Sequence, residues 1–507
     1  MNREHGFSSI DGSRHLATPA ADPRMHTASF YSRSCDSHMC SSYSGQGFTI
    51  PFSLASCHKA PVTAVGDEQG YVRLFNTTTE DGPVESKVDL HVKVHDNAIM
   101  DLAFSDDDMR LATACGDRSG KILDVMTQTV AVELGGGHCD SLRQITFQPG
   151  PANGSCLATS DRAGRIQIWD LRCSPMPTQT FSSGIINQRD TGLDAFFSKT
   201  VNTIDKAHER KMPGSTSSAS VTALQWLPEG SEHLLLSASE SNASIKLWDT
   251  RYIKPRRQAE DTPLAITPEP RSHAWRSYGI TSLALSTDAA RLYAVCKDST
   301  VYAYSTAHLL LGHAPALEHG AIKRKPHGEE GMGPLFGFKH DLFRAQSFYV
   351  KCAIRPATDH SPELLAVGSS NSCAVLFPTE ERYMRSSWAQ QSHVPHASSF
   401  NALPPLTPLQ PTSSPFCSTP SALNPSGSTI PIYKAGTPLI RGHGREVTTL
   451  SWSYDGKLIT ASDDYVVRQW QEDATKARHL RTVGEFGGER HMAGWADVTS
   501  DWDSDDD

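Results

Sequence analysis

Two arginines lie at the same offset from a Trp-Asp pair in two stretches of the sequence, WDLR (169–172) and WDTR (248–251). A guanidinium group presents five N–H donors in a fixed fork, which suits the carboxylates and carbonyls of a protein partner. Arginine is also enriched among the residues that dominate the binding energy of protein interfaces. We therefore predict one paired docking patch, made of Trp169, Asp170, Arg172, Trp248, Asp249 and Arg251.

Catalytic and metal-binding motifs do not occur in the sequence. It contains no Walker loop, no dinucleotide fingerprint after a strand, no HExxH motif and no nucleophile elbow. Cys35, His38 and Cys40 form one short cluster, but a closed zinc site needs further ligands. We therefore predict no catalytic residue, no cofactor-binding residue and no metal ligand, and we do not expect an enzyme.

A unit that repeats seven times must position the two arginines. Each unit has an alternating strand, a strand of small residues that leads into a polar turn, and an alternating strand whose clearest copies end in an aromatic residue. The copies cover 62–76, 97–125, 141–172, 220–251, 279–305, 348–377 and 444–470. One small sheet cannot bury both of its faces, whereas a ring of such sheets can. The repeats therefore predict an all-β fold, a seven-bladed WD40 β-propeller, with the arginines at the rim of one face.

Recurrent polar residues in these units fit a structural role. Buried His and Trp N–H groups need hydrogen-bond partners, which a His–Asp–Ser/Thr–Trp network within a blade would supply. We assign to such networks Asp117, Asp161, Asp464, His138, His443, Trp169, Trp248 and Trp470, and His208 precedes one further unit.

The composition of the remaining segments predicts the domain limits. Residues 1–44 are rich in Ser and His and are expected to be disordered. The propeller is expected over 45–473, with loop insertions at 173–219, 252–277, 306–340 and 380–440, and with 45–57 closing the ring against the last blade. Residues 474–507 are expected to form a short acidic tail.

Charge and hydropathy limit the partners. The net charge of −9 argues against broad binding to a phosphate backbone, so we predict no direct sequence-specific nucleic-acid binding. No apolar stretch reaches the roughly 18 residues of a membrane helix, so no membrane contact is expected. Eleven cysteines without framework spacing favour reduced thiols and an intracellular location. The basic runs KPRR (254–257) and KRKP (323–326) are possible nuclear import signals.

The sequence resembles the substrate receptors of cullin-4 RING ubiquitin ligases, which are marked by Trp-Asp-x-Arg boxes. It is most similar to the denticleless-homologue family within that group, over about residues 50–473. The resemblance rests on HDNAIMDLAFSDDDMRLATACGD (95–117), WDLRC (169–173), WDTRY (248–252), SYGITSLALSTDAARLYAVCKDSTVYAYS (277–305) and SFYVKCAIRP (347–356).

This resemblance implies a non-catalytic receptor in the nucleus. Arg172 and Arg251 would contact the damaged-DNA-binding adaptor of the ligase, and the substrates would be degron-bearing proteins on the DNA-loaded sliding clamp. Because the family's degron carries a basic residue, an acidic pocket is expected on the face opposite the arginines. Two alternatives stay open: a WD40 scaffold for chromatin assembly or histone binding, in which the arginines are incidental, and a propeller hydrolase, which would need a catalytic cluster in the channel.

Overall fold

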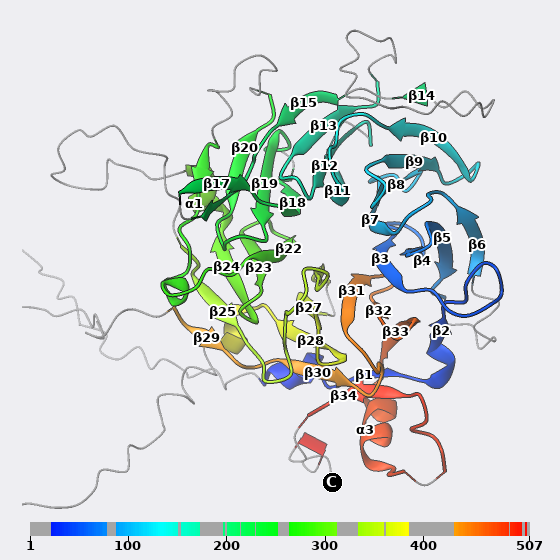
Figure 1. Cartoon of the computed structure of the whole chain (residues 1–507). Helices are drawn as coiled ribbons and strands as arrows, with labels where there is room; N and C mark the ends of the chain where they lie inside the picture. The colour runs from blue at the N-terminus through cyan, green and yellow to red at the C-terminus, as the bar shows by residue number, and fades with distance from the viewer. Residues whose placement is uncertain are drawn as a thin grey trace, which may run out of the picture.

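A computed structural model of the chain shows a closed ring of seven β-blades, of which the last two are continuous in one ten-stranded sheet (Figure 1). The structure describes residues 22–78, 88–150, 154–172, 196–197, 200–212, 214–228, 230–251, 263–311, 333–358, 361–384, 430–485, 487–498 and 502–503. The predicted all-β WD40 propeller is confirmed. Helices are few and short, and no helix within the described ranges is long and apolar enough to cross a membrane.

Each blade is a sheet whose strands follow one another from the centre of the ring to its edge. Blade 1 contains β3 (Pro51–Ser56), β4 (Val62–Asp67), β5 (Tyr71–Asn76) and β6 (Val88–Lys93). Blade 2 contains β7 (Ile99–Phe104), β8 (Arg110–Cys115), β9 (Gly120–Asp124) and β10 (Thr129–Leu134), with β14 (Phe196–Phe197) at its edge. Blade 3 contains β11 (Leu142–Phe147), β12 (Cys156–Asp161), β13 (Ile166–Asp170) and β15 (Thr200–Ile204).

The remaining blades follow the same order. Blade 4 contains β18 (Val221–Trp226), β19 (Leu234–Ser239), β20 (Lys246–Asp249) and β21 (Ala265–Ile266). Blade 5 contains β22 (Ile280–Leu285), β23 (Arg291–Cys296), β24 (Thr300–Ser305) and β25 (Phe336–Phe338), with β29 (Ile432–Tyr433) at its edge. Blade 6 contains β26 (Cys352–Arg355), β27 (Leu364–Ser369), β28 (Cys373–Pro378) and β30 (Thr437–Ile440). Blade 7 contains β31 (Val447–Trp452), β32 (Leu458–Ser462) and β33 (Val466–Glu472).

The apolar core lies between neighbouring blades. The strands of small and apolar residues are buried along their whole length, as in β19 and β27, because both faces of such a strand meet another sheet. One cluster between blades 3 and 4 joins Ile168 and Ile204 to Trp226 and Trp248. Packing of blade against blade therefore fixes the relative position of the two Trp-Asp-x-Arg boxes.

The N-terminal segment closes the ring, and this corrects the expected disorder of 1–44. Residues 22–44 are described, and β1 (Phe30–Ser32) and β2 (Ser37–Met39) both pair with β33 as the outer edge of blade 7. The expectation for 45–57 was also wrong, because β3 in that stretch is the innermost strand of blade 1. Residues 1–21 lie outside the described residues.

Buried charge anchors this N-terminal strap, defined here as residues 30–42. The Asp36 carboxylate is fully buried and accepts hydrogen bonds from the backbone N–H of Arg33 (2.8 Å) and from Gln471 Nε2 of β33 (3.1 Å). The buried Arg468 guanidinium, also on β33, donates to Ser32 Oγ at 3.0 Å. A strand of only three residues is stable here because it joins the edge of an existing sheet.

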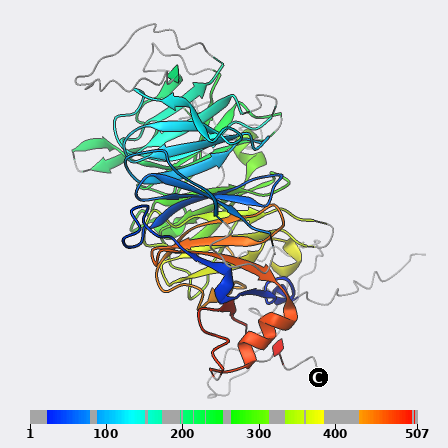
Figure 2. The same ribbon diagram turned by 90° about the vertical axis from the view of Figure 1, so that its right-hand side faces the viewer.

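The C-terminal segment is folded as well, which corrects the expected acidic tail at 474–507. Helix α3 (Ala474–Thr482) packs against β1, and β34 (Gly494–Ala496) pairs with β30 on one side and with β1 on the other. Figure 2 shows α3 beside the N-terminal strap at the edge of the last blade. Arg481 binds the Asp503 carboxylate through Nε and Nη2, at 2.8 and 2.9 Å. The part of the acidic end that is described is therefore held by an arginine.

The insertions contain the outer strands of four blades, which the sequence prediction assigned to loops. β15, β21, β25 and β30 lie within or at the edge of 173–219, 252–277, 306–340 and 380–440. Other described elements of these insertions include the hairpin of β16 (Glu209–Met212) and β17 (Ser215–Ser218) and helix α1 (Thr306–Leu311). Each outer strand has two to five residues, which is too short for a clear periodic pattern.

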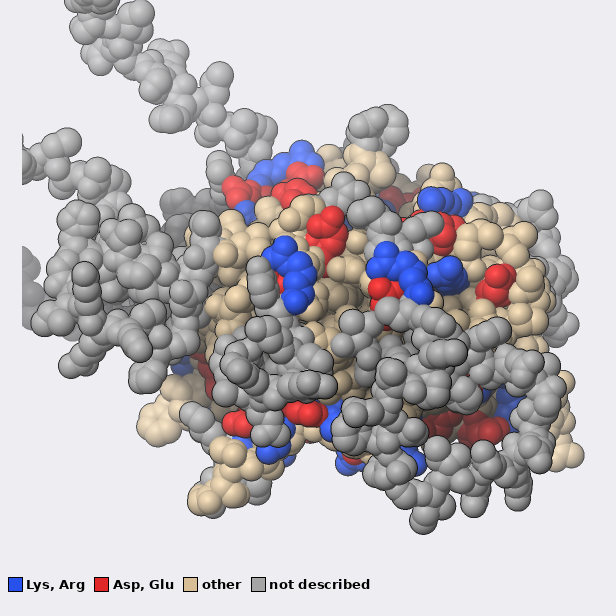
Figure 3. All heavy atoms as spheres, turned by 90° about the horizontal axis from the view of Figure 1, so that it is seen from above, with Lys and Arg blue, Asp and Glu red and all other residues tan. Residues whose placement is uncertain are grey.

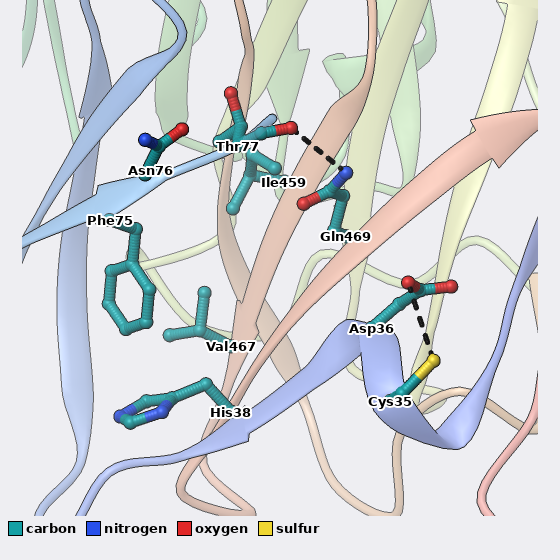
Figure 4. Close-up of a pocket in the computed structure, with 9 residues that line it drawn as sticks. All are labelled: Cys35, Asp36, His38, Phe75, Asn76, Thr77, Ile459, Val467 and Gln469. Atoms are coloured by element: carbon teal, nitrogen blue, oxygen red, sulfur yellow. Dashed lines mark hydrogen bonds between the residues drawn. The ribbon is translucent and has the colours of Figure 1, made fainter. Parts of the chain in front are cut away.

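A small cavity lies where the strap covers the seam between blades 1 and 7 (Figure 4). It measures about 30 Å³, room for one or two water molecules. Its lining includes His38 from the strap, Phe75 from blade 1 and Val467 from blade 7. The cavity is thus a packing gap beneath the strap, too small for an organic ligand.

The predicted structural networks are present. In blade 3, His138 Nδ1 lies 3.0 Å from Asp161, His138 Nε2 lies 2.6 Å from Thr159 Oγ1, and Trp169 Nε1 donates to that hydroxyl at 2.8 Å. The same chain runs through Asp464, His443, Thr460 and Trp470 in blade 7. In blade 2, His95 bridges Asp117 and Thr113. In blade 4, His208 and Trp248 share Ser237, and burial lowers the pKa of His208 to about 3.

Candidate functional site

The two Trp-Asp-x-Arg boxes have the same local geometry. Trp169 and Trp248 are buried at the ends of β13 and β20, the third strands of adjacent blades. Each following arginine turns back onto the Asp of its own box. Arg172 donates from Nε and Nη2 to the Asp170 carboxylate at 2.9 and 2.7 Å, and Arg251 donates likewise to Asp249 at 3.1 and 2.9 Å.

Both guanidinium groups reach solvent although they are paired. The side chain of Arg172 is 64% exposed and that of Arg251 is 56% exposed. The hydrogen bond with Asp170 raises the pKa of Arg172 and lowers that of Asp170, so both groups stay charged. In the second box, burial opposes ionisation of Asp249, but the hydrogen bonds from Arg251 lower its pKa overall. Each box therefore presents a charged Asp–Arg pair at the surface.

One hydrogen bond links the outer strand of blade 3 to the second box. Asn202 lies on β15 opposite Ile168, the residue before Trp169, and its Nδ2 donates to the carbonyl of Thr250 at 3.3 Å. Thr250 is the residue between Asp249 and Arg251, and its backbone N–H and hydroxyl both donate to the His233 carbonyl. The backbone of the second box is thus fixed from blade 3 as well as from blade 4.

Among the described residues, the outer edge of the ring near blades 3 and 4 carries charges of both signs (Figure 3). Figure 3 shows basic side chains on this edge beside acidic ones. Three ion pairs in blade 3, blade 4 and the turn after β15 each place an arginine beside a carboxylate: Arg172–Asp170, Arg251–Asp249 and Arg165–Asp205. Recognition at the boxes would therefore depend on directed hydrogen bonds rather than on a broad positive field. The segments that follow the arginines, 173–195 and 252–262, lie outside the described residues.

Carboxylates gather on the opposite face, where an acidic pocket was expected. Asp463 lies in the turn between β32 and β33. The equivalent turn of blade 3 comes before β13, whereas Arg172 follows the end of β13. Asp463 and the arginines therefore lie on opposite faces of the ring. Its pKa is raised, first by burial and then by the nearby carboxylates Glu446, Asp464 and Glu68. Glu446 accepts hydrogen bonds from Ser347 and Ser370, both at 2.7 Å. The sequence located acidic residues in these turns but did not indicate which of them meet.

Two groups of potential metal ligands occur within the described ranges, and both belong to the blade networks. They are His95 with Cys115 and Asp117, and His273 with Cys296 and Asp298. In each group the His bonds to the Asp, and the Asp also accepts from a neighbouring hydroxyl, Ser119 or Tyr302. These contacts give the residues a structural role. Cys35 and Cys40 do not join a metal-ligand group there, and Cys40 is a buried thiol.

The comparison with family models identifies the repeats. The WD domain, G-beta repeat model matches residues 87–124, 207–249 and 436–471. These ranges include strands of blades 1, 2, 4, 6 and 7. They also include Trp248 and Asp249 of the second box, but not Arg251.

Curated relatives match most of the chain. Cell division cycle protein cdt2 of Schizosaccharomyces pombe is 28% identical over 484 residues, which cover 92% of this chain and 76% of that protein. Denticleless protein homolog B of Xenopus laevis is 24% identical over 466 residues, covering 89% of this chain and 52% of that protein. The Denticleless protein homolog of Homo sapiens is 24% identical over 461 residues, covering 87% and 50%. The chain therefore spans about half the length of the vertebrate relatives.

Proposed function

We propose that this WD40-repeat propeller, which has homologues named cdt2 and Denticleless across species, is a substrate receptor of a cullin-4 ubiquitin ligase. A receptor of this kind performs no chemistry. It holds a substrate near the ubiquitin-transferring subunits, and the resulting effective concentration accelerates modification. The protein would accordingly be a non-catalytic subunit.

We place adaptor docking at the paired boxes. The observation that carries this proposal is the repeated geometry of Arg172 and Arg251, two exposed guanidinium groups that are each pre-oriented by a carboxylate. A fixed side chain loses little conformational entropy on binding, which favours affinity. The exposed guanidinium groups would meet carbonyls or carboxylates of the damaged-DNA-binding adaptor.

We further propose that the substrates are degron-bearing proteins on the DNA-loaded sliding clamp, and that the protein acts in the nucleus. The carboxylates around Asp463 support a site for a basic degron residue, because they lie on the face opposite the arginines. The basic runs 254–257 and 323–326, considered as import signals, lie outside the described residues.

Affinity purification of the tagged chain from cells in DNA synthesis tests the proposal. Recovery of the adaptor and of cullin-4 with the wild-type chain is expected, together with clamp-associated proteins. A non-ligase scaffold for histone binding or chromatin assembly would instead recover histones without either ligase subunit, and this result would reject the receptor role.

A further inference from the structure

Positively charged side chains converge where the central channel opens on the face opposite the boxes. Arg143 lies on β11, the innermost strand of blade 3, and its guanidinium lies over the ring of Phe348 at 4.1 Å. Phe348 stands in the segment before β26 of blade 6, so this contact joins two blades that are not neighbours in the ring. Arg162 lies at the turn between β12 and β13 on the same face, and its side chain is exposed.

The two arginines have no carboxylate partner among the residues that the structure describes. No ion pair forms with either side chain, and Arg143 Nε is buried without a hydrogen-bond partner. The charge of Glu240 acts on Arg143, but this carboxylate already pairs with Arg210 at 3.6 Å. Burial and then the charge of Arg162 lower the pKa of Arg143, while Tyr349, which forms a side-chain hydrogen bond with Arg143, and the charge of Glu240 oppose this shift.

A third cation lies beside the innermost strands of neighbouring blades. Lys351 Nζ donates to the backbone carbonyls of Thr281 (3.1 Å) and Thr222 (3.4 Å), on the innermost strands of blades 5 and 4. Asp101 is the carboxylate that offsets this charge, and it also accepts the backbone N–H of Ile145 at 3.0 Å.

Aromatic rings form the wall beside the arginines. Phe348 and Tyr349 lie 3.9 Å apart between ring centroids, and Tyr349 lies 5.2 Å from Phe52 of β3. The Arg143 guanidinium lies over Phe348 and also forms a side-chain hydrogen bond with Tyr349, so this wall positions it at the channel mouth.

We propose that the channel mouth, defined by Arg143, Arg162, Phe348 and Tyr349, binds one anionic side chain of a protein segment that lies across this face. The ligand chemistry is a carboxylate or a phosphoryl group, because a guanidinium fork binds either one through paired hydrogen bonds. A peptide is favoured over a nucleic acid since the cations converge on a single point rather than along a track. The site is separate from the boxes and does not depend on ligase docking.

Retention of degenerate peptide libraries by the immobilised full-length chain tests this site. Three libraries of twelve-residue peptides carry a fixed central phosphothreonine, glutamate or threonine. The wild-type chain is expected to retain at least one anionic library about tenfold more than the threonine library. Preference for phosphothreonine over glutamate would identify a phosphoryl ligand, and equal retention would identify a carboxylate-type site.

Matched variants separate this site from general charge attraction. R162Q changes an exposed side chain and R143K keeps the charge of Arg143 without its fork, so neither is expected to disturb folding. Both are expected to reduce retention to the level of the threonine library. R118Q, in the corresponding turn of blade 2, changes the net charge equally and is expected to retain the wild-type preference. The proposal is overturned by equal retention of all three libraries, or by R118Q and R162Q having the same effect.

Discussion

Asn202 of blade 3 donates a hydrogen bond to the carbonyl of Thr250, the residue that precedes Arg251 in blade 4. The arginine of one blade is thus positioned partly by a side chain of its neighbour. This contact explains how two boxes that lie 79 residues apart in the sequence (Trp169 to Trp248) can act as one surface.

The variant N202A is expected to weaken adaptor binding by about two- to fivefold, because a neutral hydrogen bond contributes about 1 kcal/mol. Biolayer interferometry with the purified adaptor measures this change. T203A is the control, since Thr203 Oγ1 bonds to Gln167 within blade 3 and not to the second box. Equal losses of affinity for the two variants would argue against coupling through Asn202.

The variant T159V is expected to lower the free energy of unfolding by about 2–4 kcal/mol. It keeps the side-chain volume but leaves the buried indole N–H of Trp169 and the ring nitrogen of His138 without their shared hydroxyl. Urea unfolding followed by tryptophan fluorescence measures the change. T127V removes an exposed hydroxyl pair and should stay within about 0.5 kcal/mol of wild type. A T159V midpoint close to that of T127V would contradict a stabilising role for the network.

The variant D36A tests closure of the ring by the N-terminal strap. Loss of the buried carboxylate leaves Gln471 Nε2 unpaired and releases the turn at Arg33, so a loss of about 2–4 kcal/mol is expected. Limited proteolysis should then cut within residues 30–42 before any other described segment. D96A removes an exposed pair with Lys93 and serves as the control. Resistance of the strap in D36A would show that closure does not depend on this carboxylate.

Burial of His38 predicts a pH dependence of stability. Burial, and then the charge of Arg73, lowers its pKa from 6.5 to about 4. As pH falls below 6.5 the unfolded chain binds a proton that the folded chain does not, so stability decreases until about pH 4. One such group contributes a slope of up to about 1.4 kcal/mol per pH unit. The variant H38F removes this group, and a smaller loss of stability between pH 7 and pH 5 is expected; an unchanged loss would contradict this explanation.

The repeated parts of the fold could be predicted from the sequence, and the non-repeated parts could not. Period-two alternation and the polar turns indicated seven blades, and the recurrence of residues such as His138, Asp161 and Trp169 indicated a network that the structure confirms. By contrast, β1 and β34 have three residues each, and pairing with an existing edge defines them rather than any local pattern. Composition alone therefore misassigned both termini.

The candidate site was predictable in residue type but not in arrangement. The shared offset of Arg172 and Arg251 from Trp-Asp identified the boxes, whereas nothing in the sequence pairs Asn202 with Thr250. The Arg143–Phe348 contact joins residues 205 positions apart in sequence, so only the closed ring brings them together.

The most direct test of the receptor assignment is the affinity of the purified double variant R172A/R251A for the purified adaptor. We predict that binding falls at least about a hundredfold, because two exposed, pre-oriented guanidinium groups are removed together. The control R210A/R382A also removes two exposed, ion-paired arginines and should bind as wild type does. Wild-type affinity of R172A/R251A, with its melting temperature unchanged, would contradict docking through the boxes.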